Sequence, residues 1–215
     1  MKERPIIFSA PMVLAILEGR KTMTRRVVRD IKQPGDTAHR MSAAAEKACL
    51  NDDGEWVFED LDETSRYVVD CPYGKPGDRL WVRETCRAMR MPSEIWGVRY
   101  LADLDWRPNA KAEALAWYGR REGAHMPPKN VPAIHMPRWA SRITLEITAV
   151  RVERLNDITV ADAVAEGALV KREVDQFARV HAISMFSAIW QGIHGPGSWD
   201  ANPWVWVIEF KRVFS

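Results

Sequence analysis

Cysteine and histidine are scarce in this chain, and their spacing is as informative as their number. The three cysteines, Cys49, Cys71 and Cys86, are odd in number and form no C-x-x-C pair. The five histidines show neither H-x-x-x-H nor H-E-x-x-H spacing. A disulfide framework, a zinc ribbon or a metalloprotease helix would need such patterns. We therefore expect free thiols, no metal site and no cofactor.

Long apolar runs are missing as well. No segment approaches the roughly 20 consecutive apolar residues of a membrane-spanning helix, and residues 1–11 lack the apolar region of a signal peptide. The formal net charge is only +2, so any attraction for nucleic acid must come from local clusters of basic residues. We expect a cytoplasmic protein that has no membrane partner.

Internal repeats, low-complexity tracts and glycine-rich phosphate loops are absent. Gly195, Gly197 and Ser198 do not form a nucleophile elbow, because no strand pattern leads into them and no helix pattern follows. The hydrophobic content of 47% and the charged content of 28% are typical of a globular protein. A length of 215 residues is short for two full domains, so we predict one domain over 1–215 that carries insertions.

Three helices are predicted from short periodic patterns. Segment 9–19, SAPMVLAILEG, has a capping serine, a proline in the first turn and a terminal glycine. Thr159 and Asp162 are spaced like a capping box and Gly167 lies at a stop position, so a second short helix would carry Glu166 in its last turn. A longer amphipathic helix is predicted over 174–193.

Strand patterns lie between these helices. Residues 22–28 are rich in β-branched side chains, and residues 79–84 alternate in polarity after a turn at 76–78. Residues 143–154 alternate and change phase near Ala149, which is typical of a long strand with a bulge or bend. Residues 204–211 also alternate, with Trp204 and Trp206 on one face. This order of elements indicates an α+β fold around a small β-barrel flanked by short helices.

Two segments look like insertions into that fold. Residues 31–70 hold ten acidic side chains against four basic ones, and we predict a surface insertion with a turn and a short strand near 51–60. Residues 87–140 are irregular and rich in proline, arginine and tryptophan, with one predicted helix near 111–118. A connection of this length is usually a functional flap or arm.

The segment EGRKTMTRR, residues 18–26, is the most unusual part of the chain. Basic side chains at a helix end are favoured by the helix dipole and by solvent, so a solvated corner is one interpretation. A site is the other, because neighbouring arginines and burial would both lower the pKa of Lys21 and make it a base. The lysine would lie at the corner between a helix and a strand.

Two carboxyl groups are candidates for the same site. Glu166 would lie at the C-terminal end of a helix, where the dipole opposes ionisation. Glu84 would end a strand on the side of the apolar residues. The plain alternatives are a solvated glutamate at a helix end for Glu166 and an ion pair with an arginine for Glu84.

Several motifs together resemble the ASCH domain, which has a barrel fold similar to that of pseudouridine synthases and archaeosine transglycosylases (PUA-like). They are LEGRKTMTRR, PGDRLWVRE, ITLEITAV, DAVAEG and WVWVIEFKR, and they occur in the family order. The segments IHMPRWASRI and GPGSWDANPWVW resemble an elaborated branch found in phages and bacteria. The two insertions lie outside the minimal domain.

The resemblance implies a function and a site. Small bacterial members are N4-acetylcytidine amidohydrolases, with a lysine and a threonine in a GRKTxT motif and a glutamate in a short helix. Matched by motif, these are Lys21, Thr24 and Glu166, which we expect to be the base, the nucleophile and the proton donor. We assign Arg26, Glu84 and Trp199 to binding of the substrate, a small modified nucleoside. The small enzymes have no counterpart of Glu84, so either carboxyl could be the catalytic one.

Two other functions fit the same residues. PUA-like barrels often bind RNA, and the arginines together with Trp139 and Trp199 could contact phosphates and stack on bases. A ribonuclease would use the same lysine on a ribose hydroxyl. Binding alone predicts steep salt dependence without turnover, whereas a nucleoside hydrolase acts on the free nucleoside in moderate salt.

Overall fold

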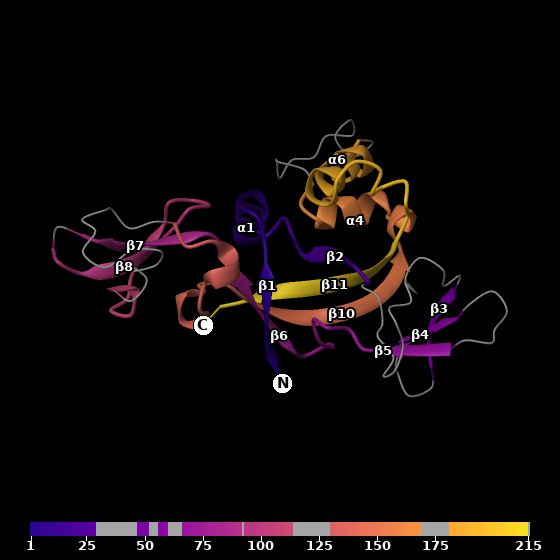
Figure 1. The fold of residues 1–215 in the computed structure, drawn as a ribbon, viewed down its shortest axis with the longest axis horizontal. Coiled ribbons are helices and arrows are strands. Elements are labelled where there is room, and N and C mark those ends of the chain that lie inside the picture. The colour runs from indigo at the N-terminus through magenta and orange to yellow at the C-terminus, as the bar shows by residue number, and fades with distance from the viewer. Residues whose placement is uncertain are drawn as a thin grey trace, which may run out of the picture. The chain divides into compact units, whose positions relative to one another are not determined.

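The computed structural model describes residues 1–28, 47–51, 56–59, 66–91, 93–113, 130–168 and 181–214. The fold is mixed α+β, with many strands and few helices, as the sequence predicts. The chain divides into two compact units, and Figure 1 labels the helices and strands that belong to them. The first unit comprises Met1–Gly19, Asp78–Glu146 and Arg212–Ser215; the second comprises Arg20–Gly77 and Ile147–Lys211.

The first unit begins with β1 (Glu3–Ile7) and α1 (Ala10–Leu17). β1 runs parallel to β6 (Arg79–Arg83), and β6 pairs antiparallel with the start of β10 (Thr144–Arg154). The 3-10 turns η1 (Ala133–His135) and η2 (Arg138–Ala140) precede β10. The predicted strand at 79–84 and the predicted first helix are both confirmed. β1 was not predicted, because Pro5 interrupts its apolar residues.

The described residues 87–91, 93–113 and 130–140 are not irregular, so for them the prediction of an irregular segment was wrong. β7 (Cys86–Arg90), β8 (Trp96–Tyr100) and β9 (Trp106–Pro108) form an antiparallel sheet. One face of this sheet packs into a core with Val131, Met136 and Ala140. Met89 and Trp106 on the other face, and Arg90 on the core-side face, break the alternation of polarity that marks a strand. Most of the helix predicted near 111–118 lies outside the described residues.

The second unit is built on β2 (Met23–Val27) and β11 (Trp204–Val213), which pair antiparallel. The later part of β10 is the other neighbour of β11, and β2 is the last strand of the order. η3 (Leu155–Asp157), α4 (Val160–Ala165) and α6 (Ala182–His194) follow β10. The strands predicted at 22–28, 143–154 and 204–211 are confirmed, and so is the short helix before Gly167.

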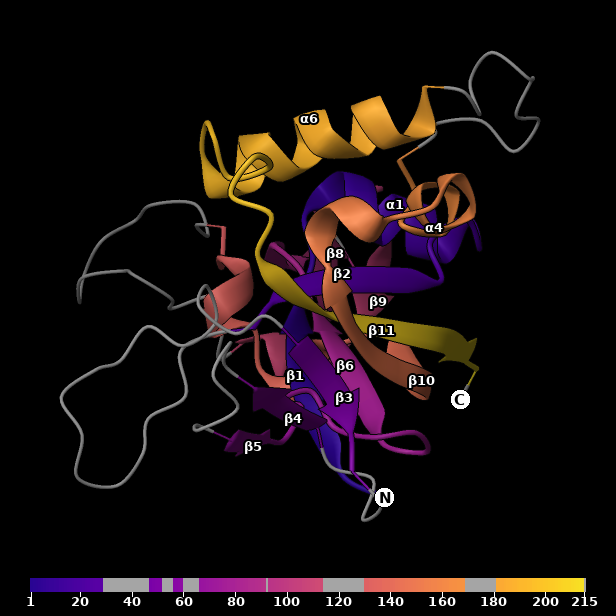
Figure 2. The ribbon, with the colours of Figure 1, turned by 90° about the vertical axis from the view of Figure 1, so that its right-hand side faces the viewer.

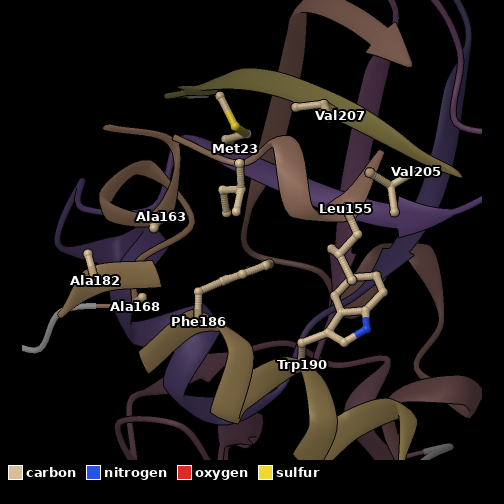
Figure 3. Packing of buried hydrophobic residues seen from close by; sticks show 10 residues of the cluster. Met23, Leu155, Ala163, Ala168, Ala182, Phe186, Trp190, Val205 and Val207 are labelled. Atoms are coloured by element: carbon tan, nitrogen blue, oxygen red, sulfur yellow. The ribbon is translucent and has the colours of Figure 1, made fainter. Parts of the chain in front are cut away.

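Helices cover one face of the β2–β11 pair and a small sheet covers the other (Figures 1 and 2). Phe186 and Trp190 extend from α6 toward the strands, where they pack with Leu155, Val205 and Val207 (Figure 3). Complete burial of such a side chain stabilises a fold by about 2 kcal/mol. The helix predicted over 174–193 is observed from Ala182; residues 169–180 lie outside the described residues.

The acidic insertion contributes a three-stranded antiparallel sheet to the second unit. Its strands are β3 (Lys47–Leu50), β4 (Trp56–Glu59) and β5 (Arg66–Val69). Trp56 meets Trp206 edge to face at 6.3 Å between ring centroids, and Phe58 meets Trp204 at 5.9 Å. The predicted strand near 51–60 is confirmed as β4, whereas β3 and β5 were not predicted.

No closed barrel is found among the described strands, so the PUA-like barrel stays a prediction. None of the described helices combines the length and the apolar composition that crossing a bilayer requires.

Candidate active site

Lys21 and Glu166 form a buried ion pair in the second unit. Lys21 Nζ donates to Glu166 Oε2 at 2.6 Å and to the backbone carbonyl oxygen of Glu166 at 2.9 Å. The lysine side chain is 0% exposed and the glutamate side chain 3%. The two residues are 145 positions apart in sequence. The structure therefore brings together two of the three residues that the sequence predicts to be catalytic.

Local backbone geometry places both groups. Gly19 has φ +74°, the left-handed conformation that ends a helix and that a side chain would strain. The chain then reaches β2 through Lys21 and Thr22, and the N–H of Thr22 donates to the carbonyl of Ala165 at 2.9 Å. This bond ties the end of α4 to the start of β2. Glu166, the next residue, is thereby held beside Lys21.

The capping box that starts α4 is present as the sequence predicts. The Thr159 side chain accepts from the N–H of Asp162, and the Asp162 side chain accepts from the N–H of Thr159. Only the six residues of α4 separate this cap from Glu166. The cap therefore helps to fix the orientation of α4 and, with it, the position of Glu166 at the end of the helix.

The environment of Lys21 lowers the pKa of its ammonium group. Desolvation by burial is the main cause, and the positive charges of Arg26 and Arg25 act in the same direction. The carboxylate of Glu166 opposes them without reversing the direction. Lys21 consequently gives up its proton more readily than an exposed lysine, as the sequence predicts.

Glu166 offers one oxygen that Lys21 does not use. Its Oε1 is buried, has no hydrogen-bond partner in the described part of the chain, and lies 3.5 Å from Arg25 Nη1. Buried acceptors are rarely left without a donor. A substrate N–H or O–H group that reached this oxygen would complete its hydrogen bonding.

Thr24 and Arg26 lie on the other face of β2 from Met23 and Arg25, because strand side chains alternate. Thr24 is 3% exposed and pairs in register with Ile208. Burial lowers the pKa of Arg26, while the charges of Tyr73 and Glu166 oppose this effect. β2 is the last strand of its sheet, so one of its edges is not paired with another strand. Glu166 lies beside this edge, because Thr22 bonds to Ala165, the residue before Glu166. Side chains from either face of β2 can extend past such an edge.

Sequence reasoning missed three residues of this neighbourhood. Arg25 was considered only as a like charge, but it is the second cation beside Glu166. Tyr73 lies in a turn without periodicity, and its charge acts on Arg26. His194 ends α6, and its ring packs against that of Trp190 with the ring centroids 4.2 Å apart. Burial and the charge of Arg26 lower the pKa of this ring. No local pattern in the sequence identifies Tyr73 or His194.

A network of charges holds Arg25 in place. Asp162 accepts from Arg25 Nη2 at 2.9 Å and from Arg151 Nη2 at 3.3 Å, and Glu153 pairs with both arginines. Burial raises the pKa of Asp162, but Arg25, the Thr159 N–H and Arg151 outweigh burial and lower it. Asp162 therefore has a structural role: it caps the start of α4 and also accepts a hydrogen bond from Arg25.

Glu84 belongs to the first unit and is fully engaged there. Arg142 donates from Nε to Oε1 at 2.9 Å and from Nη2 to Oε2 at 3.0 Å, and both side chains are 2% exposed. Burial raises the pKa of Glu84, with Arg142 opposing it. The ion-pair interpretation explains this residue, and no contact supports the assignment of Glu84 to substrate binding.

Replacing Glu84 by alanine is expected to destabilise the fold and to spare the chemistry. Loss of one partner of a buried ion pair costs about 3 kcal/mol. Among the described residues, Arg142 would keep Asp103 and Asp105 as acidic partners, and both are more exposed than Glu84. Urea unfolding measures this loss. The matched control is Glu94→Gln, which breaks an exposed pair with Arg90 and should cost less than about 0.5 kcal/mol. Equal losses in the two variants would contradict the assignment.

Trp199 and Trp139 are both half-buried, not fully exposed to solvent. Trp199 meets Phe186 edge to face at 6.2 Å and packs against the helix cluster of the second unit. Trp139 packs against the core of the first unit. Packing accounts for both side chains, and no contact supports the assignment of Trp199 to substrate binding.

Comparisons with protein-family models, with curated proteins and with solved structures found no match for this chain. In the described parts of the chain, no group of three or more His, Cys, Asp or Glu side chains is arranged to hold a metal ion. Arguments about function therefore start from the chemistry of Lys21, Glu166 and their neighbours.

Proposed function

We propose that this chain is an amidohydrolase of the ASCH type that cleaves the N4-acyl amide of acylated cytosine nucleosides, releasing cytidine and a carboxylic acid. The observation that supports this proposal is the buried Lys21–Glu166 ion pair, formed between the GRKTMT and DAVAEG motifs. A solvated corner would leave Lys21 exposed. Burial of an amine whose pKa is lowered favours a role as a base.

The reaction needs a nucleophile, a base and a proton for the departing nitrogen. In the first step the Thr24 Oγ–H loses its proton to the neutral amine of Lys21 as the oxygen attacks the acyl carbonyl. The C–N bond then breaks and N4 leaves as the amino group of cytidine. Its proton comes through Glu166, whose Oε2 already accepts from Lys21 Nζ at 2.6 Å.

Water completes the cycle. It attacks the acyl–threonine ester and gives one proton to the Lys21–Glu166 pair, and Thr24 leaves as the alcohol by taking a proton back. The net reaction converts one amide and one water molecule into one amine and one carboxylic acid. Cytosine is a good leaving group because its ring withdraws electron density from N4, so threonine, lysine and glutamate supply all the groups this reaction requires.

The direct test is hydrolysis of free N4-acetylcytidine by the purified protein. We expect cytidine and acetate to be released in equal amounts, resolved by liquid chromatography, and we expect Lys21→Ala and Glu166→Ala to lose this activity. Lys111→Ala, an exposed lysine of the first unit, is the control and should match the wild type. Absence of cytidine release by the wild-type protein would overturn the proposal. Salt-sensitive binding without turnover would instead indicate a binding module.

Activity should depend on pH through Lys21. Below its pKa the lysine is protonated and cannot accept the threonine proton, so kcat/KM should rise with pH as Lys21 becomes neutral. Because burial lowers this pKa, the rising limb should lie below 10.5, the ordinary value for lysine. Kinetics between about pH 5 and pH 10 test this prediction. A rate that does not rise within this range would contradict the assignment of Lys21 as the base.

A further inference from the structure

The sheet β7–β8–β9 of the first unit has two very different faces. Cys86, Ala88, Val98 and Tyr100 point into the core of the unit. Alternation places every other residue of the strands on the opposite face. That outer face carries Arg87, Met89, Gly97, Arg99, Trp106 and Pro108, and none of these six residues is acidic.

Two arginines on the outer face lie directly across from each other. Arg87 pairs in register with Arg99, and like charges in this position destabilise a sheet. Arg87 Nε donates to Asn130 Oδ1 at 2.8 Å, but within the described ranges neither arginine has an acidic partner. By contrast, Arg90, whose side chain is on the core-side face, pairs with Glu94. The outer face therefore holds two positive charges that nothing described here neutralises.

An aromatic ring lies beside these charges. Trp106 pairs in register with Arg99, and its indole comes close to the backbone of β8 at Gly97. A Cβ at position 97 would stand 2.3 Å from Trp106 Cε2 and 2.4 Å from Nε1, so only glycine allows this position of the ring. The indole is consequently held against the sheet.

Arg99 Nε and Trp106 Nε1 are both buried and have no hydrogen-bond partner in the described part of the chain. Buried donors without an acceptor are uncommon in native proteins and require an explanation. Two cations and an aromatic ring are the groups that contact a phosphodiester and an unpaired base.

We propose that the outer face of the β7–β8–β9 sheet binds single-stranded nucleic acid, with phosphate oxygens on Arg87 and Arg99 and a base stacked on Trp106. A duplex hides the faces of its bases, so a ring held in this way selects a single strand. No group of this surface recognises a sugar, so RNA and DNA single strands should bind alike. The inference is independent of the proposed hydrolase, which uses residues of the second unit.

Fluorescence anisotropy with labelled oligouridine and oligothymidine of about 12 nucleotides tests the surface, since OB-fold domains occupy sites of this order. We expect Trp106→Ala to weaken binding about tenfold, and Trp106→Phe, which keeps an aromatic ring, to stay within about threefold. Arg99→Gln should lower the slope of log affinity against log salt by about 0.7, the value for one phosphate contact on a single strand. Arg90→Gln removes the same charge on the other face and should change neither quantity.

Four results would overturn the inference. The wild-type protein could fail to bind single strands, or Arg90→Gln could weaken binding as much as Arg99→Gln does. A duplex of the same length could bind as tightly as the single strands. Vesicles that contain phosphatidylserine could bind with the same dependence on Trp106, which would indicate a lipid surface instead. Thermal unfolding of each variant checks its fold, and the N4-acetylcytidine assay separates this surface from the proposed active site.

Discussion

Thr24→Ala is expected to lower kcat/KM for N4-acetylcytidine by at least about a thousandfold, because Thr24 carries the one buried hydroxyl of the GRKTMT motif and is the proposed nucleophile. Removing the Oγ atom removes the group to which the acyl chain would be transferred, whereas the fold should change little. Initial rates of cytidine release give kcat and KM separately. Loss in kcat without a rise in KM is the expected signature of a nucleophile.

The chain supplies its own control for this prediction. Thr22 is two residues away in the same motif and is exposed, and its backbone N–H, rather than its side chain, makes the bond to Ala165. Thr22→Ala should therefore retain activity within about twofold, in keeping with the small effect of most surface substitutions. Thr24→Ser keeps a hydroxyl and should retain part of the rate. A Thr24→Ala variant that worked at the wild-type rate would exclude Thr24 as the nucleophile.

The second large effect is on stability. Glu166→Ala should lower the free energy of unfolding by about 3 to 5 kcal/mol, because it leaves the ammonium of Lys21 buried without its charged partner. The double variant Lys21→Met, Glu166→Leu replaces both charges by apolar groups of similar size and should recover most of this loss. Denaturant unfolding of the single and double variants gives the coupling energy of the pair.

This experiment also separates folding from chemistry. The double variant should be folded and inactive, which a purely structural role of the pair would not require. The exposed pair of Arg90 and Glu94 is the reference, with an expected coupling below about 0.5 kcal/mol. A Glu166→Ala variant as stable as the wild type would contradict the expected loss of stability.

Local rules predicted the elements that carry the site. Gly19 and Gly167 both adopt positive φ at the ends of helices, and the capping box at Thr159 is present. β6 follows its alternation of polarity, whereas β11 is buried on both faces over its first five residues. These features depend on neighbours within a few residues, which a single sequence contains. The placement of Glu166 at the end of α4 followed directly from them.

Contacts between residues that are far apart in sequence could not be predicted in the same way. Glu84 was left between a pocket and an ion pair, and the choice depends on Arg142, 58 residues away. The sheet β7–β8–β9 was missed because its strands are short and its outer face mixes arginines with apolar residues, so the pattern looked irregular. Tyr73 and His194 come near Arg26 only through tertiary structure.

The shortness of α4 has a consequence for how this protein responds to heat. A helix of six residues is not stable by itself, so its cap at one end and the Thr22–Ala165 bond at the other decide whether it stays docked. Such a segment opens as a unit at lower cost than a strand ladder. When it opens, the carboxyl of Glu166 departs from Lys21 while β2 and β11 remain paired, so turnover would cease at a temperature at which the sheet is still intact.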